Sequence, residues 1–235
     1  MGKELFIRLA LKFKPNIIPL RNSLDDEIIG FIHSILGKCN KWHDSFSRYS
    51  ISSMCGGKIV DGMYVFDKGG TIYVSSSDEE FILTFLANLK KVNGFKVCGF
   101  EYIGYDYVSN EIMSNYDIVK TLSPILLKTS KDKVDKYITI ENKEEFFKTL
   151  NEHCYRKLKN QGFTDNDLKG FLIEPFHFEC ASLKKSHHKN YTLPCSKLMM
   201  IIKGKSVCRK CLYEIGIGSS TGYCFGSIEI KNIQK

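Results

Sequence analysis

The 235-residue sequence lacks the features of a membrane protein and of a secreted protein. No apolar run approaches the roughly 20 residues that are needed to span a bilayer. Residues 1–14 alternate apolar and charged side chains, which predicts a strand and not the continuous apolar core of a signal peptide. These absences predict a cytoplasmic protein without a membrane partner. Because 43% of the residues are hydrophobic, the chain can still bury a core.

The cysteines do not form a disulfide framework. There are nine of them, an odd number, scattered along the chain, which favours reduced and buried thiols that pack as small hydrophobes. The only closely spaced pair is Cys208 and Cys211. One Cys-x-x-C without a second pair or nearby histidines is a weak zinc signal, so ordinary helix packing is favoured and no metal or cofactor is expected. A zinc or thiol protein that uses this pair remains an alternative.

Acidic residues are missing from a long stretch of the C-terminal half. No Asp or Glu lies between Glu179 and Glu214, and the stretch carries eight basic residues against a net charge of +8 for the whole chain. The basic residues are Lys184, Lys185, Lys189, Lys197, Lys203, Lys205, Arg209 and Lys210. Such a concentrated positive charge favours a polyanion partner through counterion release, although a solvated lysine-rich loop would show the same composition. The candidate polyanion contacts in this segment are Lys184, Lys185, Lys189, Lys203 and Lys205.

Hydrophobic periodicity predicts the order strand, helix, strand, strand, helix, strand in the first half. The expected elements are a strand at 4–13, a helix over 26–36 after an N-cap at Ser23, a hairpin of 58–66 and 71–75 that turns through Asp67–Gly70, a helix from a capping box of Ser77 and Glu80 to Leu89, and a strand at 95–108.

The second half predicts the same order with more interruption. The expected elements are a strand at 117–127, a polar loop at 129–136, a helix from the Asn142 and Glu145 cap to about Asn160, strands at 170–182 and 191–203 around a basic loop, a helix near 205–213, a glycine-rich loop and a strand at 223–231. The chain is therefore predicted to be an α+β protein of two tandem ferredoxin-like (βαββαβ, RRM-like) domains, at 1–112 and 113–235.

The glycine-rich loop carries Gly216, Gly218, Gly222 and Gly226 within eleven residues. Glycines at this density admit positive φ angles and let the backbone approach an anion closely. A tight turn would explain only one or two of them. A dinucleotide-binding loop needs a strand before it and a helix after it, and a Walker loop needs a following Gly-Lys-Ser/Thr. Here a helix precedes the loop and a strand follows it, and no Gly-Lys-Ser/Thr follows, so nucleotide binding is disfavoured.

This loop, followed by a closing strand, resembles the C-terminal glycine-rich loop of repeat-associated (RAMP) CRISPR proteins. Within that superfamily the sequence is most similar to the Cas6 endoribonucleases, which process precursor CRISPR RNA. RLALKF, DEIIGFIHSIL, YVFDKGGTIYVSSSDEEFILTFLANL and TLSPILLK also resemble that family, in the same order. The resemblance implies RNA laid along a basic cleft. It also implies metal-independent cleavage by the ribose 2′-hydroxyl, which yields a 2′,3′-cyclic phosphate and a 5′-hydroxyl.

The resemblance also implies catalytic residues. The family's catalytic histidine follows the first helix and matches His43, and His33 stands where the family often carries a tyrosine. The family often has a lysine several residues after the histidine, but no lysine lies between His43 and Lys58, and Arg48 is the nearest cation. Histidine can serve as acid or base near neutrality, and arginine can bind two phosphoryl oxygens. His33 could equally be a semi-buried packing residue.

One further interpretation of the function remains open. The chain could be a non-cleaving, RNA-binding subunit of a CRISPR effector complex with the same fold, and whether it forms a homodimer stays undetermined. His153 and His177 are expected to be structural, whereas His187 and His188 are expected in a surface loop. CRISPR repeat RNA is the expected partner, and effector subunits are further candidates.

Overall fold

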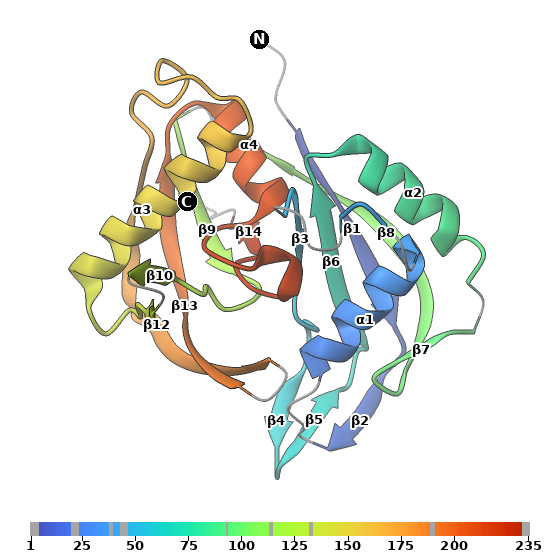
Figure 1. The fold of residues 1–235 in the computed structure, drawn as a ribbon. Coiled ribbons are helices and arrows are strands. Elements are labelled where there is room, and N and C mark those ends of the chain that lie inside the picture. Colours follow the sequence, from blue (N-terminus) through green and yellow to red (C-terminus); the bar gives the residue numbers. More distant parts are fainter. Residues whose placement is uncertain are drawn as a thin grey trace.

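The computed structural model describes residues 5–19, 24–37, 40–42, 47–92, 94–112, 115–131, 134–188 and 191–231. Two antiparallel sheets lie side by side, with α1 and α2 over one and α3 and α4 over the other (Figure 1). The first sheet has the strand order β3-β6-β1-β8-β7 and the second has the order β12-β13-β9-β14. None of the described helices is long and apolar enough to cross a membrane.

The N-terminal half contains β1 (Leu5–Phe13), β2 (Asn16–Pro19), α1 (Leu24–Leu36), β3 (Tyr49–Ile51), β4 (Lys58–Val60), β5 (Met63–Phe66), β6 (Gly70–Ser76), α2 (Glu79–Leu89), β7 (Lys96–Val97) and β8 (Phe100–Glu111). The order β3-β6-β1-β8 is the ferredoxin-like order of a βαββαβ unit. Helix α1 buries Ile28, Ile32 and Ile35 on one face, as their helical spacing predicts.

The C-terminal half contains β9 (Tyr116–Thr121), β10 (Lys128–Lys131), β11 (Val134–Tyr137), α3 (Lys143–Asn160), β12 (Leu172–His188), β13 (Tyr191–Lys203), α4 (Ser206–Ile215), the 3-10 helix η1 (Thr221–Tyr223) and β14 (Ile228–Ile230). The order β12-β13-β9-β14 repeats that of the first sheet, which confirms the predicted fold class. The capping box is also confirmed, since the Asn142 side chain accepts a hydrogen bond from the Glu145 amide at 3.2 Å.

The hairpin predicted from 58–66 and 71–75 is wrong. Strands β4 and β5 form a hairpin with each other around Asp61 and Gly62, and β5 pairs with β2, whereas β6 pairs with β1 and β3. Asp61 and Gly62 have φ angles of 48° and 73°, which suit an Asp-Gly hairpin turn. The Asp61–Gly62 turn lies inside residues 58–66, which the periodicity predicts to be one strand. The N-cap of α2 is Asp78 and not Ser77.

Two segments predicted as loops are strands. The expected loop at 129–136 instead contributes to β10 and β11, which pair as a hairpin, and β12 continues to His188 through most of the expected basic loop. The β10 and β11 strands, KTSK and VDKY, lack the apolar alternation of a half-buried strand, so their sequence resembles that of a polar loop. The side chains of 177–188 are not described, which leaves the expectations for His177, His187 and His188 outside the described structure.

Polar contacts join the two halves. The Arg8 guanidinium of β1 donates to the Ile228 carbonyl at 2.5 Å and lies 5.5 Å from the centre of the Tyr73 ring. The Ser75 hydroxyl of β6 donates to the Tyr213 carbonyl of α4 at 3.1 Å. Arg8 is 2% exposed, and burial lowers its pKa to about 10. The two sheets are therefore held in one arrangement, which positions α4 and the loop that follows it between them.

Candidate functional site

The glycine-rich loop owes its conformation to close packing against the protein itself. Gly216 has φ 72° and ψ 173°, a region that is essentially restricted to glycine. Gly218 and Gly226 also have positive φ angles, of 73° and 61°. A Cβ on Gly218 would lie 2.7 Å from the Leu126 carbonyl oxygen, and one on Gly226 would collide with the Ile217 carbonyl. Internal packing alone therefore requires glycine at these three positions.

Backbone hydrogen bonds hold the loop in place. The Ile217 amide donates to the Gly226 carbonyl at 2.9 Å and closes the base of the loop. The Ser219 amide donates to the Leu126 carbonyl and the Gly226 amide to the Pro124 carbonyl, both at 2.8 Å. The loop is thus attached to the segment between β9 and β10, so it presents a fixed surface to any ligand.

The tip of the loop meets the N-terminal half at Tyr49, a residue that sequence reasoning did not single out as a site. The Thr221 hydroxyl donates to the Tyr49 carbonyl at 3.1 Å. A Cβ on Gly222, whose φ is not positive, would lie only 2.8 Å from the Tyr49 hydroxyl oxygen. The Tyr49 ring also stacks on Phe81, with the ring centroids 4.6 Å apart. The Tyr49 side chain therefore packs between the glycine-rich loop and α2.

His33 lies on the other side of Tyr49. Its Nε2 atom is 3.5 Å from the Tyr49 hydroxyl oxygen, and the His33 side chain is half-buried. Burial raises the pKa of Tyr49 to about 12, so this residue presents a protonated phenol at neutral pH. The structure therefore places His33, a predicted catalytic residue, within contact distance of Tyr49, which the tip of the glycine-rich loop also contacts.

His43 falls in residues 43–46, which lie outside the described residues, but both flanks of this segment are described. Before it, the Trp42 indole donates to the Asp78 carboxylate at 2.9 Å. After it, the carbonyl of the exposed Arg48 accepts a hydrogen bond from the Ser77 amide at 3.0 Å. The chain on either side of His43 is thus attached to the N-terminus of α2, close to Tyr49.

Lys157 supports the glycine-rich loop from α3. Its buried ammonium donates to the Ile215 carbonyl at 3.3 Å, the Gly216 carbonyl at 3.1 Å and the Thr221 hydroxyl at 3.3 Å. The two carbonyls terminate α4, where the helix dipole favours a cation. Burial lowers the pKa of Lys157 to about 8. Nothing in the local sequence distinguishes Lys157 from the other lysines of this helix.

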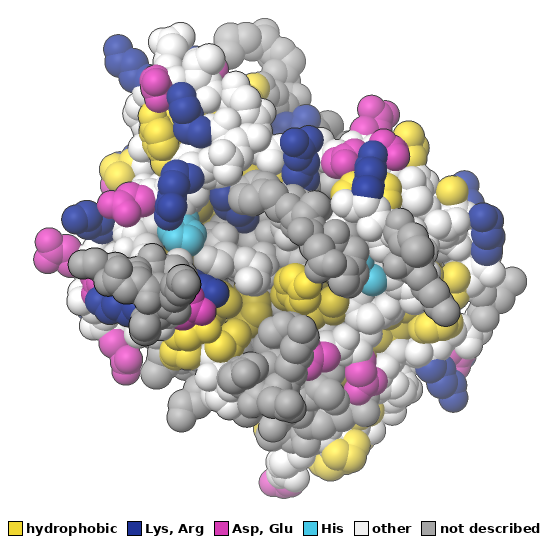
Figure 2. Space-filling model, viewed as in Figure 1, with side chains coloured by type: hydrophobic (Ala, Val, Ile, Leu, Met, Phe, Trp, Pro, Cys, Tyr) yellow, Lys and Arg dark blue, Asp and Glu magenta, His cyan; other side chains and the backbone are white. Residues whose placement is uncertain are grey.

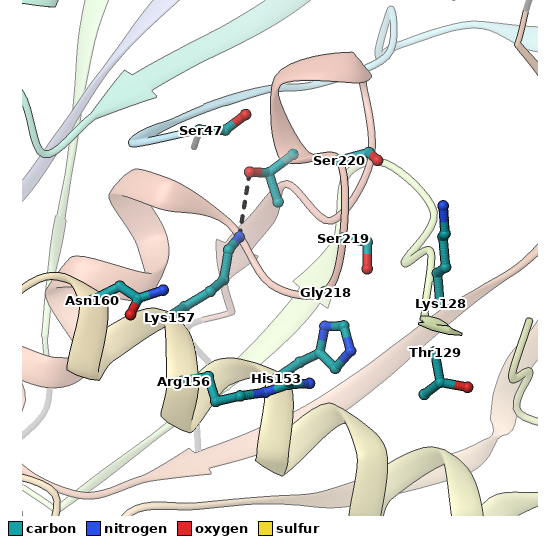
Figure 3. Close-up of a pocket in the computed structure, with 11 residues that line it drawn as sticks. Ser47, Lys128, Thr129, His153, Arg156, Lys157, Asn160, Gly218, Ser219 and Ser220 are labelled. Carbon is teal, nitrogen blue, oxygen red and sulfur yellow. Dashed lines mark hydrogen bonds between the residues drawn. The ribbon is translucent and has the colours of Figure 1, made fainter. Parts of the chain in front are cut away.

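A cavity of about 590 Å³ opens between α3 and this loop (Figure 3). Its lining residues are Ser47, Lys128, Thr129, His153, Arg156, Lys157, Asn160, Gly218, Ser219, Ser220 and Thr221. His153 was expected to be structural but lines this cavity. Burial, together with the positive charges of Arg156 and Lys157, lowers its pKa, so the imidazole is neutral at pH 7.

The predicted basic segment is only partly available to a ligand. Lys203 pairs with Glu174 at 2.6 Å, and Lys205 pairs with Asp167 at 3.1 Å. Lys205 precedes α4 and the glycine-rich loop follows it, so the ten residues of this helix separate them by about 15 Å. Lys189 lies outside the described residues, and the side chains of Lys184 and Lys185 are not described.

Arg209, a third cation of this segment, is fully buried. Its guanidinium pairs with the buried Asp117 carboxylate, which also accepts a hydrogen bond from the Tyr213 hydroxyl at 2.6 Å. A charge held in this way attaches α4 to β9. Arg209 therefore contributes to the fold and adds nothing to the charge of the surface.

Cys208 and Cys211 pack in the C-terminal core on α4. Burial raises the pKa of Cys211 to about 12, which disfavours the thiolate that metal binding requires. Within the described ranges, no three His, Cys, Asp or Glu side chains are close enough to hold a metal ion.

Two tandem ferredoxin-like domains are the architecture that this chain shares with solved structures of CRISPR-associated Cas6 proteins. Residues 108–230, more than half of the chain, match the family described as CRISPR associated protein Cas6, C-terminal. The protein therefore belongs to the Cas6 family of CRISPR-associated endoribonucleases, which confirms the resemblance seen in the sequence.

Individual relatives agree with this assignment. The CRISPR-associated endoribonuclease Cas6 1 of Methanocaldococcus jannaschii is 27% identical over 179 residues, which cover 73% of this chain and 69% of that protein. A solved structure of a Cas6-related protein from Pyrococcus furiosus is 22% identical, with a TM-score of 0.76, over 99% of this chain and 100% of that one. A structure described as a RAMP protein binding different RNA substrates is 20% identical, with a TM-score of 0.75, over 96% of this chain and 100% of that one.

Proposed function

We propose that this protein cleaves precursor CRISPR RNA within its repeats without a bound metal. The ribose 2′-hydroxyl attacks the adjacent phosphate and leaves a 2′,3′-cyclic phosphate and a 5′-hydroxyl. The junction at Tyr49 carries this proposal, because the loop hydrogen-bonds to the residue that follows Arg48 and contacts His33. The N-terminal domain, residues 1–112, supplies the catalytic side chains, and the C-terminal domain, residues 113–235, supplies the loop.

The reaction requires a base for the 2′-hydroxyl, an acid for the leaving oxygen and a cation for the phosphate. His43 takes one of the two proton-transfer roles, and His33 is the candidate for the other. The exposed Arg48 stabilises the charge that develops on the phosphate. His33 lies in α1 and contacts the Tyr49 hydroxyl, and Arg48 directly precedes Tyr49, the first residue of β3.

RNA binding is assigned to the positive and glycine-rich elements of the C-terminal domain. The proposed RNA-binding residues are Lys184, Lys185, Lys189, Lys203, Lys205, Gly216, Gly218, Gly222 and Gly226. Lysines positioned against phosphates give affinity that falls with salt and depends little on sequence. The RNA described for the related RAMP structure supports this assignment.

The direct test is single-turnover cleavage of the cognate repeat RNA, with and without EDTA. We expect equal rates in both conditions and a cyclic phosphate on the 5′ fragment, identified by its mass. A rate that collapses in EDTA and recovers with added divalent metal would overturn the metal-independent mechanism.

His43→Ala tests the central assignment. A positioned histidine typically contributes about 10²–10⁴-fold, so we expect a single-turnover rate lower by that factor with nearly unchanged RNA affinity. His33→Ala should cost about as much if His33 transfers the second proton, and little if it only packs. Full cleavage by His43→Ala would refute the assignment.

A second function follows from one departure from the family pattern. Because no lysine lies between His43 and Lys58, the site lacks the lysine that the family often carries there, and Arg48 is the nearest cation. A non-catalytic RNA-binding subunit of an effector complex would tolerate that loss. Tight repeat binding by wild-type protein without any cleavage would establish this second function in place of the first.

A further inference from the structure

The cavity between α3 and the glycine-rich loop has the lining of an anion site. Lys128, Arg156 and Lys157 contribute positive charge, and the loop contributes hydroxyl groups, while none of the described residues that line it is Asp or Glu. Figure 3 shows Lys128 and Lys157 on opposite sides of the space, with the His153 ring between them. On the molecular surface, Lys and Arg side chains gather around a histidine over α3 (Figure 2).

The charges differ in how far they are already neutralised. Lys128 pairs with Asp135 at 2.7 Å, and Lys157 donates to the three oxygens of the loop and α4. Arg156 is exposed, and within the described part of the chain it forms no salt bridge. Its guanidinium is therefore the group that an incoming anion would neutralise most directly.

His153 complements these cations with a neutral ring. It lies one helical turn before Arg156 on the same face of α3, and both line the cavity. A neutral imidazole can donate one hydrogen bond to a phosphoryl oxygen without adding charge repulsion to an already basic site.

The cavity adjoins the candidate catalytic region. Ser47 lines it and precedes Arg48, and Thr221 joins the cavity wall to Tyr49 through its hydrogen bond. A polymer that has one phosphate near Arg48 can therefore place another phosphate between α3 and the loop. A free nucleotide would make no use of this proximity.

We propose that this cavity binds a non-scissile backbone phosphate of the RNA, held by Arg156, His153 and Lys128. The site rests on the proposed RNA-cleaving function and adds a second anchoring point, on α3, that sets which phosphodiester enters the catalytic region. Arg156 provides the main charge, and the hydroxyl groups of Ser219 and Ser220 complete the lining.

The test removes phosphate charges one at a time. Repeat RNA with a 2′-deoxy substitution at the cleavage position prevents turnover, and a single methylphosphonate is placed at each position in turn. Binding is measured for wild type, Arg156→Ala and the control Lys148→Ala, which removes an exposed lysine from the same helix outside the cavity. Thermal unfolding confirms that each variant is folded.

One charge-assisted hydrogen bond corresponds to about 10–100-fold in affinity. With a methylphosphonate at one non-scissile position, we expect the RNA affinity of wild type and of Lys148→Ala to fall by that factor. The affinity of Arg156→Ala should not change with the same substitution. His153→Asn should reduce the loss of affinity that a methylphosphonate causes at the same position. Normal cleavage and binding with no position that depends on Arg156 would overturn the phosphate site and leave the proposed function standing. Failure of wild type to bind repeat RNA would overturn both.

Discussion

The buried ammonium of Lys157 makes a prediction about stability as a function of pH. Lys157→Met removes the ammonium but keeps most of the length of the side chain and its apolar volume. The wild-type ammonium donates to neutral oxygens, the carbonyls of Ile215 and Gly216 and the hydroxyl of Thr221. Its burial lowers the pKa from 10.5 to about 8. The folded protein therefore releases this proton at a lower pH than the unfolded chain does.

The magnitude follows from these two pKa values. Below about pH 8 both states carry the proton, whereas between about pH 8 and 10.5 only the unfolded chain keeps it. The unfolded chain then binds more protons, so the free energy of unfolding rises with pH, by at most about 1.4 kcal/mol per pH unit. Integrated from pH 7 to 9.5, this contribution is about 2 kcal/mol. The Lys157→Met variant lacks it entirely.

The assay is urea unfolding at pH 7 and pH 9.5, followed by the fluorescence of Trp42, the single tryptophan of the chain. Other titrating groups affect wild type and variant alike, so the difference between their unfolding free energies isolates Lys157. We expect that difference to shift by about 2 kcal/mol in favour of wild type at the higher pH. Lys159→Met on the same helix removes an exposed lysine and is the matched control.

A difference that stays constant from pH 7 to 9.5 would refute the reasoning, because Lys157 would then titrate alike in both states. The same pH dependence of the difference between wild type and Lys159→Met would also refute it, because the effect would then result from net charge and not from burial.

Three further predictions concern the loop and the basic segment. Gly226→Ala should lower the free energy of unfolding strongly, because the new methyl group meets the Ile217 carbonyl at a positive φ, whereas Gly222→Ala, at a φ that is not positive, meets only the Tyr49 side chain and should cost less stability while still reducing RNA affinity; equal losses in denaturant melts would contradict this contrast. Reversing Lys184 and Lys185 to Glu should weaken binding of cognate and unrelated RNA alike and flatten the salt dependence, and unchanged affinity across a salt series would exclude them from the interface. Arg209→Met leaves its buried partner carboxylate without a counter-charge and should cost about 3–5 kcal/mol of stability, which chemical denaturation can measure.

The helices and their order could be predicted from the sequence. Helix α1 follows from apolar residues that recur three and four positions apart, and α3 begins where Asn142 and Glu145 form a capping box. Both signals depend on residues within about one helical turn of each other, so no knowledge of distant partners is needed. The glycine-rich loop was likewise visible, because three of its glycines occupy backbone conformations that other residues rarely adopt.

Strand partners were harder to predict. The run at 58–66 looks like one strand followed by a turn, but its pairing with β2 depends on a segment more than forty residues earlier in the chain. The β10–β11 hairpin is polar and carries no apolar alternation. Which strand a segment joins is decided by long-range packing that local periodicity does not encode.

The charged residues show most clearly what the sequence by itself determined and what only the tertiary structure decided. Composition alone established an excess of positive charge and a stretch without acids. The fold decided that Arg209 is buried against Asp117, and that His153 and Lys157 line the cavity beside the loop. A side chain's charge is local, but its exposure and its partners arise when elements distant in sequence pack together, so only the tertiary structure determines which charges face a ligand.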